Sequence, residues 1–180
     1  MNDKDITVIR CDRKNLLMRV EHNGKITVRV PRRVPEAEIK QFIESHREWM
    51  EKNIAALGEI APPFTWEELN ALADEALKYF PPVVARYAAA VGVTYGKITI
   101  RDQHKRWGSC SSQGNLNFNC TLMLAPESVR EYVVVHELCH RRQMNHSPAF
   151  WQEVARVMPD YDTAREWLKT EGVKIIGRIP

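Results

Sequence analysis

Apolar and polar residues alternate or cluster over three short stretches at the start of the chain. Residues 6–10, 16–21 and 25–30 carry this pattern, which is typical of strands. Asn23-Gly24 separates the last two stretches, and this dipeptide favours a type I′ turn between antiparallel strands. The chain is therefore expected to begin with a small antiparallel sheet.

A helical spacing follows Pro35. The residues that recur at intervals of three and four are Ile39, Phe42, Ile43, His46, Trp49 and Met50. This spacing places them on one face and predicts an amphipathic helix. Pro62-Pro63 then marks a boundary. We expect an N-terminal β-hairpin and helix subdomain at residues 1–61 and a second unit at residues 62–180.

The second unit opens with a helix signal. Thr65-Trp66-Glu67-Glu68 has the capping-box pattern, and one apolar face continues from Leu69 to Phe80. Pro81-Pro82 is expected to break this helix and to start another that ends at Gly92. Two helices in succession are thus predicted between residues 65 and 92.

Strand and helix patterns alternate in the rest of the chain. Residues 97–101 and 115–120 are predicted strands, with a turn at residues 111–114 before the second. A helix is expected from Pro126 to about Met144, and Ser147-Pro148 favours the start of another. A last short helix should end at Gly172. These elements predict an α+β fold.

Composition sets limits on the class of protein. The chain has 180 residues, enough for one domain with a small appended subdomain, and its formal net charge is +3. That charge is too weak to demand nucleic acid or an anionic membrane as a partner, so neither a membrane nor nucleic acid is the expected partner. The N-terminus lacks a signal-peptide pattern, no apolar stretch could span a membrane, and the four cysteines show no Cys-x-x-Cys spacing. A cytoplasmic protein with reduced thiols is expected.

One segment carries metal chemistry. His136-Glu137-Leu138-Cys139-His140 is followed by His146. Positions four apart on a helix lie about 40° apart around the axis, so His136 and His140 project side by side toward one ion. Two imidazoles and one further ligand would hold Zn²⁺ with one position open to water. Glu137 on the same turn could take the proton of that water, which predicts a zinc hydrolase with one zinc per chain.

The identity of the third ligand has two interpretations. His146 completes an all-imidazole set, provided that the chain turns back after His140, and Asn145 could supply a left-handed residue for that turn. The alternative is a carboxylate on the next helix, for which Glu153 is the first available. Cys139 is expected to be a buried thiol and not a fourth ligand.

Three separated segments together resemble the YgjP-like metallopeptidase-domain family. They are the helix motif, the preceding Arg106-Trp107-Gly108-Ser109-Cys110-Ser111-Ser112 and the following Asn145-His146-Ser147-Pro148-Ala149-Phe150-Trp151. The resemblance implies a compact zincin-like domain with a small antiparallel sheet and an active-site helix. It also implies that His136, His140 and His146 are metal ligands and that Glu137 is the catalytic base. A member of the family is associated with UTP pyrophosphatase activity, so the resemblance leaves the substrate open.

Three functions are therefore compared. A metallopeptidase would direct the activated water at a peptide carbonyl, and the strand at residues 115–120 could align a peptide by edge pairing. A nucleotide pyrophosphatase would release UMP and pyrophosphate from UTP, with Lys105 and Arg106 facing the phosphates and Trp107 stacking on the base. In a non-catalytic module, zinc would only brace a nucleic-acid-binding fold. Glu137 argues against this last alternative, because a structural zinc site needs no neighbouring base. A peptide or a nucleoside triphosphate is therefore expected as the substrate.

Overall fold

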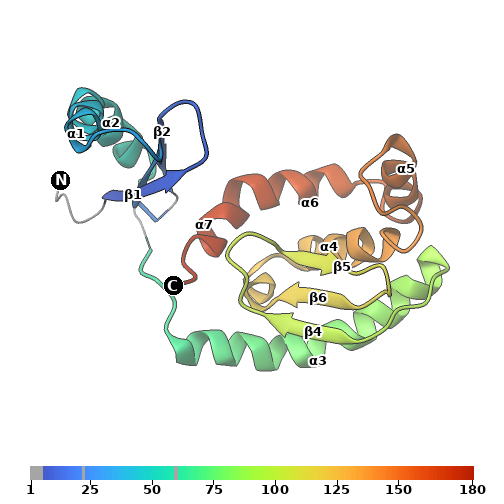
Figure 1. Ribbon diagram of the computed structural model, residues 1–180. Helices are drawn as coiled ribbons and strands as arrows, with labels where there is room; N and C mark the ends of the chain where they lie inside the picture. Colours follow the sequence, from blue (N-terminus) through green and yellow to red (C-terminus); the bar gives the residue numbers. More distant parts are fainter. Residues whose placement is uncertain (1–5, 22, 59–60) are drawn as a thin grey trace. The chain divides into compact units, whose positions relative to one another are not determined.

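The chain folds into two compact units, residues 1–62 and residues 63–180. The computed structural model describes residues 6–21, 23–58 and 61–180 (Figure 1). Each unit combines helices with a three-stranded sheet, so the fold class is α+β, as predicted. None of the helices in the described part of the chain combines the length and the apolar character that a membrane span requires.

The N-terminal sheet differs from the prediction in its strand directions. Its strands are β1 (Ile6–Cys11), β2 (Leu17–Val20) and β3 (Ile26–Pro31). The order is β1-β3-β2, with β1 parallel and β2 antiparallel to β3. The sheet is therefore mixed. β3 lies at the centre, and its alternate residues Ile26, Val28 and Val30 are fully buried in a core that they share with Ile39 and Met50.

The β2–β3 hairpin is present, but its turn is not of type I′. The Glu21 N–H donates to the Lys25 carbonyl over 2.8 Å, and the Gly24 N–H donates to the Glu21 carbonyl over 2.9 Å. Gly24 has a φ of 77°, whereas no described residue other than glycine has a positive φ. A type I′ turn needs positive φ at both central residues. Asn23 does not meet that requirement.

Two helices cover one face of this sheet where a single helix was expected. They are α1 (Glu36–Ser45) and α2 (Arg47–Ala56), and they are separated by His46 with φ −108° and ψ 11°. The His46 Nδ1 atom lies 2.8 Å from the Phe42 carbonyl oxygen. The break lets Ile39 and Met50 both reach the core beneath β3. Periodicity alone does not reveal such a break, because both helices keep the same apolar spacing.

The second unit begins with one continuous helix, α3 (Trp66–Val91), and the predicted break at Pro81-Pro82 is wrong. The capping box at Thr65 and Glu68 is present, and Gly92 ends the helix with a φ of 76°. Both prolines lie on the exposed side of the helix, which Figure 1 shows as one curved ribbon. Water can bind the carbonyls that they leave free, while Phe80 and Val84 stay fully buried on the opposite side.

A mixed sheet forms the centre of the second unit. Its strands are β4 (Ile98–Arg101), β5 (Gly108–Cys110) and β6 (Leu116–Asn119), in the order β4-β6-β5. β4 runs parallel and β5 antiparallel to β6, so the predicted antiparallel sheet is again mixed. β5 was not predicted as a strand. β6 lies at the centre, so residues 115–120 cannot pair with a peptide at an edge; of the two edge strands, β5 is the one that contacts Glu137.

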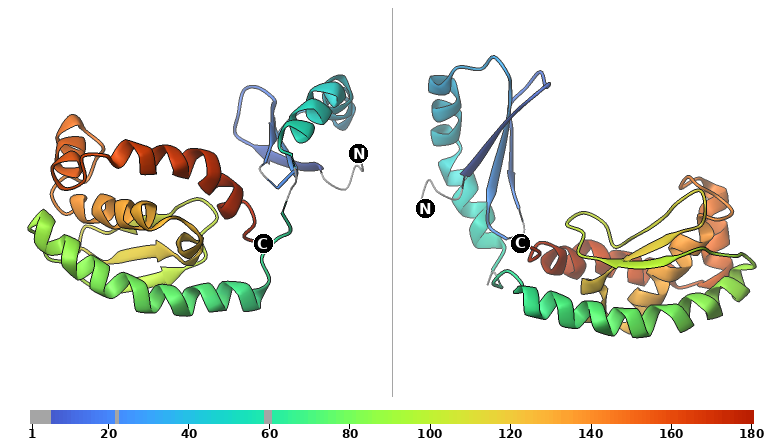
Figure 2. Two further views of the ribbon diagram at one scale, coloured as in Figure 1. Left: turned by 180° about the vertical axis from the view of Figure 1, so that it is seen from behind. Right: turned by 60° about the horizontal axis from the view of Figure 1, so that its bottom comes forward.

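Helices pack around this sheet and position the site. After a 3₁₀ helix (Cys120–Leu124), α4 (Glu127–Cys139) lies against one face of the sheet, as both views in Figure 2 show. α5 (Pro148–Val157), α6 (Tyr161–Trp167), one π-helical turn (Leu168–Gly172) and α7 (Val173–Ile176) complete the chain. The helical structure thus continues past Gly172, which has helical φ and ψ. The Phe80 and Phe118 rings stack with centroids 4.5 Å apart and join α3 to β6 in the core.

Candidate metal centre

α4 carries the first two histidines of the motif at its end. The run Val133 to Val135 is buried in the core, which fixes the helix immediately before His136. The helix ends at Cys139, five residues earlier than predicted, and His140 is its C-cap. The backbone then turns tightly, with the Arg142 and Gln143 N–H groups donating to the Cys139 carbonyl. Two candidate ligands therefore lie on one turn of α4, and the chain bends directly after them.

The bend brings His146 to the other two histidines. Ring nitrogens of His136, His140 and His146 lie within 4.8 Å of one another, and the Nε2 atoms of His136 and His146 are 3.0 Å apart. Two nitrogens that bind one tetrahedral zinc at about 2.0–2.1 Å are roughly 3.3 Å apart. The three imidazoles therefore fit a zinc ion. The turn needs no left-handed residue at Asn145, contrary to our expectation, because only glycines among the described residues have positive φ.

Hydrogen bonds orient two of the rings. The His140 Nδ1 atom lies 3.1 Å from the Gln143 carbonyl oxygen, to which it can only donate. This bond places the proton on Nδ1 and leaves Nε2 free to bind a metal. The His136 Nδ1 atom lies 3.5 Å from the Tyr132 hydroxyl. Tyr132 was not singled out in the sequence, although it precedes His136 by one helical turn and therefore shares its face.

Phe150 packs against all three histidine rings. Its ring centroid lies 4.9, 4.6 and 4.8 Å from those of His136, His140 and His146, and the side chain is fully buried. Burial lowers the pKa of His136 to about 3, with smaller contributions from His140 and His146. Burial also lowers the pKa of His140. Both rings are accordingly neutral at pH 7, which is the form that binds a metal.

Glu137 lies between the histidines and β5. Its side chain is only 5% exposed, and burial raises its pKa to about 8, against a smaller opposing effect of Arg106. Gly108 packs directly on it, since a Cβ at residue 108 would lie 2.7 Å from Oε1 and 2.8 Å from Cγ. A carboxylate with a pKa near neutrality is suited to accept and return a proton.

Two cavities meet at this carboxylate. One has a volume of about 250 Å³ and the other about 260 Å³, and both are lined by Arg106, Gly108, His136 and Glu137. The first continues past Lys105, Trp107 and Tyr132, and the second past His140 and His146. The predicted substrate-binding residues Lys105, Arg106 and Trp107 thus lie beside the histidines.

The segment that carries these three residues is fixed from both sides. Asn119, which is 1% exposed, donates from its side-chain amide to the carbonyls of Gln103 and Arg106 over 2.6 and 3.0 Å. Trp107 packs against the backbone at Gly172, where a Cβ would lie 2.9 Å from its ring. The tryptophan is therefore partly engaged by the C-terminal helical segment.

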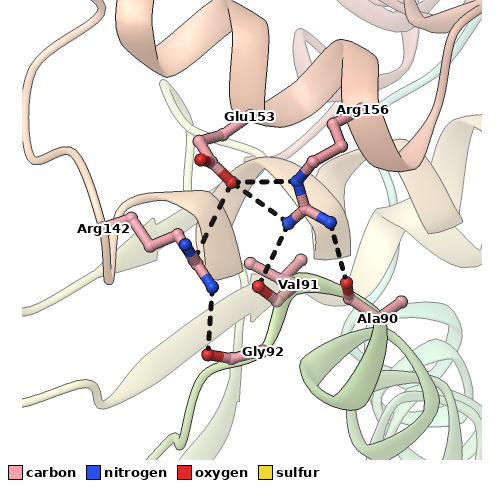
Figure 3. A network of polar contacts seen from close by, with 6 residues as sticks. All are labelled: Ala90, Val91, Gly92, Arg142, Glu153 and Arg156. Carbon is pink, nitrogen blue, oxygen red and sulfur yellow. Dashed lines mark hydrogen bonds and ion pairs between the residues drawn. The ribbon is translucent and has the colours of Figure 1, made fainter.

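Glu153, the alternative third ligand, binds two arginines instead. Its carboxylate lies 3.1 Å from Arg156 and 3.8 Å from Arg142 (Figure 3). The same guanidinium groups donate to the carbonyls of Ala90, Val91 and Gly92 at the end of α3. The network joins the turn after His140 to α3 and α5, and thereby holds the segment that delivers His146. Cys139 is fully buried in the core, as predicted.

Comparisons with known proteins give one family and two similar structures. The sequence matches the family model described as "YgjP-like, metallopeptidase domain" at residues 14–71 and 67–171. The similar structures are the metallopeptidase zymogen abylysin of Pyrococcus abyssi, 22% identical with a TM-score of 0.45, and the metallopeptidase zymogen jannalysin of Methanocaldococcus jannaschii, 18% identical with a TM-score of 0.44. Each similarity covers 50% of this chain and 93% of the other. No curated protein sequence matches the chain.

Proposed function

The chain belongs to the YgjP-like metallopeptidase-domain family, and on that premise we propose that it is a zinc-dependent peptidase with Glu137 as its catalytic base. The observation that carries the proposal is the placement of Glu137 at the wall shared by two cavities, beside three converging imidazoles. His136, His140 and His146 would hold one zinc ion per chain. A bound zinc ion supplies a Lewis acid and lowers the pKa of water to about 7.

The protein's own groups account for the remaining steps. Glu137 removes a proton from the attacking water and later passes it to the leaving amine, and its buried carboxylate is held for this task by Gly108 and the end of α4. A zinc ion beside this group would lower its pKa from the metal-free value, because a nearby positive charge favours the carboxylate. Arg106 acts in the same direction.

β5 provides the surface that aligns a peptide. The Asn119 N–H donates to the Trp107 carbonyl, and the Ser111 N–H donates to the Asn115 carbonyl. Because hydrogen-bonded and non-bonded pairs alternate along an antiparallel ladder, Gly108 and Cys110 point their backbone N–H and C=O groups to the free edge. An extended peptide can pair with this edge and pass over Glu137. The carbonyl to be cleaved would then lie next to the histidines.

A nucleotide pyrophosphatase would use the same cleft to bind a triphosphate. It would direct Lys105 and Arg106 at a triphosphate, and both side chains line the 250 Å³ cavity. The family description names a metallopeptidase domain, and no comparison names a nucleotide. We therefore favour the peptide substrate and use the nucleotide as a competing arm of the assay.

One experiment tests the proposal. The zinc-loaded protein is incubated with an unbiased peptide pool and, separately, with UTP, and cleavage products and pyrophosphate are measured. Peptide cleavage that falls at least a hundredfold in Glu137→Gln, while zinc content stays at about one per chain, is the expected result. Peptide cleavage that survives this substitution, or pyrophosphate release without peptide cleavage, would overturn the proposal.

A further inference from the structure

Positive charge is concentrated in one part of the N-terminal unit. Residues 6–33 contain eight Lys and Arg against two Asp and Glu, a net charge of +6. The segment that forms α1 and α2, residues 36–56, contains three against five, a net charge of −2. The net charge of +3 for the whole chain therefore conceals a strongly basic sheet packed on acidic helices.

The strand register shows which side chains face away from the helices. Ile26, Val28 and Val30 point into the core, so Thr27 and Arg29 point outward. Pairing then places the exposed Ile9 and Leu17 on either side of Arg29. The same register places Thr7 and Arg19 on either side of Thr27. The outward face thus has a row of hydroxyl groups and arginines, with apolar side chains only at its edges.

More cations gather at one end of this face. β1 and β3 run parallel and their pairing ends at Cys11 and Pro31. The residues that follow the two strands therefore lie at the same end of the sheet. An ion pair of 2.7 Å between Arg32 and Asp12 connects the segment that follows β3 to the segment that follows β1. Arg13, Lys14 and Arg33 lie next to this pair. All three are exposed, and no ion pair engages any of them within the described part of the chain.

We propose that this surface binds the phosphate backbone of nucleic acid. We call it the basic face and define it by Arg13, Lys14, Arg19, Arg29, Arg33 and the hydroxyls of Thr7 and Thr27. Cations that outnumber the carboxylates around them repel one another, and a polyanion that releases its counterions on binding relieves this repulsion. The proposal concerns the N-terminal unit alone and does not depend on the peptidase activity.

Three features favour nucleic acid over an acidic protein or a membrane. Four of the five cations of the basic face are arginines, whose planar guanidinium groups match phosphate better than the lysine ammonium does. The charges extend along the sheet from Arg19, which pairs with Thr27, through Arg29 to Arg33 beyond the end of β3, about 20 Å, which suits a ligand with regularly repeated charges. The face also lacks the continuous apolar centre that a protein interface needs, because Arg29 separates Ile9 from Leu17.

The same face predicts binding without base specificity. Residues 6–33 contain no Phe, Trp or Tyr on which a base could stack. Contacts to phosphate fix a protein on nucleic acid but carry no sequence information. Duplex and single-stranded probes should therefore bind through the same residues.

Fluorescence anisotropy with labelled 20-mers of random sequence tests the proposal on the full-length protein. Duplex DNA, single-stranded DNA and single-stranded RNA are the three arms, measured at about 50 and about 200 mM salt. About four phosphate contacts should weaken duplex binding roughly a hundredfold between the two salt concentrations. Arg29→Glu combined with Arg33→Glu should weaken binding at least tenfold at the lower salt concentration. The pair Arg13→Glu and Lys14→Glu, in the loop after β1, should do the same without any change within a strand.

Lys40→Glu combined with Lys52→Glu is the matched control, because it changes the net charge equally on the helices of the same unit. Its binding should stay within about twofold of the unchanged protein. Equal loss in the control and in the basic-face variants would overturn the proposal, as would the absence of binding by any probe at the lower salt concentration. Vesicles with about 30% phosphatidylserine form a further arm. Variant-sensitive binding to vesicles without binding to nucleic acid would assign the face to membranes instead.

Discussion

Gly108 lies directly against the carboxylate of Glu137, so close that a Cβ on residue 108 would stand 2.7 Å from Oε1. Real side chains do not tolerate such a contact, so any larger residue must displace either β5 or the glutamate. The edge of the sheet and the proposed catalytic base therefore depend on each other's position. A glycine in a short edge strand has a specific purpose here, which is to admit the carboxylate.

Gly108→Ala should consequently lower kcat for peptide cleavage at least tenfold and leave zinc content unchanged. The three atoms nearest to the added methyl group, Oε1, Cγ and Cδ, all belong to Glu137, so the change acts first on the proposed base. Steady-state kinetics and metal analysis on the same sample measure the two quantities. Combining it with Glu137→Asp provides the control, since the shorter side chain makes room for the methyl group. If Gly108→Ala lowers kcat by the same factor in the Glu137→Asp background as in the unchanged protein, the contact with Glu137 does not cause the loss of activity.

Glu153→Ala should weaken zinc binding roughly tenfold, because outer groups that orient metal ligands have effects of this size. Without Glu153, Arg142 and Arg156 lose their shared carboxylate, and the segment between His140 and His146 is held less firmly. Competition with a chromogenic chelator measures the affinity. Glu166→Ala is the control. It removes the ion pair between Glu166 and Lys169, which lies after α6, and should leave the zinc affinity unchanged. Unaltered affinity in Glu153→Ala would show that the network does not support the site.

Tyr87 should make the protein less stable as the solution becomes strongly alkaline. Burial, together with a 2.7 Å hydrogen bond to Glu131, raises its pKa to about 12. An unfolded tyrosine ionises near pH 10, so between about pH 10 and 12 the unfolded state releases a proton that the folded state keeps. The free energy of unfolding must then fall across this range. Urea unfolding at about pH 8, 10 and 11 should show a shallower fall for Tyr87→Phe, and equal slopes for both proteins would contradict the assignment.

Phe80→Ala should destabilise the second unit by about 3–5 kcal/mol, the usual effect of removing a buried aromatic ring. Phe80 is fully buried and stacks on Phe118, so its loss opens a cavity between α3 and β6. Chemical denaturation followed by circular dichroism gives the value. Leu77→Ala on the same helix is the comparison, because Leu77 is 55% exposed and should cost less than about 0.5 kcal/mol. If both substitutions lower the free energy of unfolding by similar amounts, the stacked rings of Phe80 and Phe118 contribute little to stability.

The features that depend on neighbouring residues were predicted well. His136 and His140 share one helical turn, so their spacing alone was enough to place them together. The capping box at Thr65 is local in the same way. The choice between His146 and Glu153 was not local, because it depends on where α5 packs. Only the ion pairs with Arg142 and Arg156 show that Glu153 is occupied elsewhere.

Errors arose where tertiary packing overrides a local preference. Pro81-Pro82 normally ends a helix, but here both residues face water while Phe80 holds the helix in the core. The strand β5 was missed because Gly108-Ser109-Cys110 lacks the β-branched and aromatic residues that mark strands. Residues 108–110 form a strand because they pair with β6. Without knowledge of that pairing, the contact between Gly108 and Glu137 could not be predicted.

The three proposed ligands also differ in how they are anchored to the fold. His136 lies in a helix whose preceding residues are buried, whereas the exposed His146 follows a turn outside any helix. Opening of residues 141–147 alone would dismantle the triad while α4 stays intact. Metal exchange should then be a local event, with a rate set by fluctuations of one short segment and not by global unfolding. A protein loaded with the proposed zinc ion is expected to lose it in mild denaturant and to regain it on dilution, while its core stays folded.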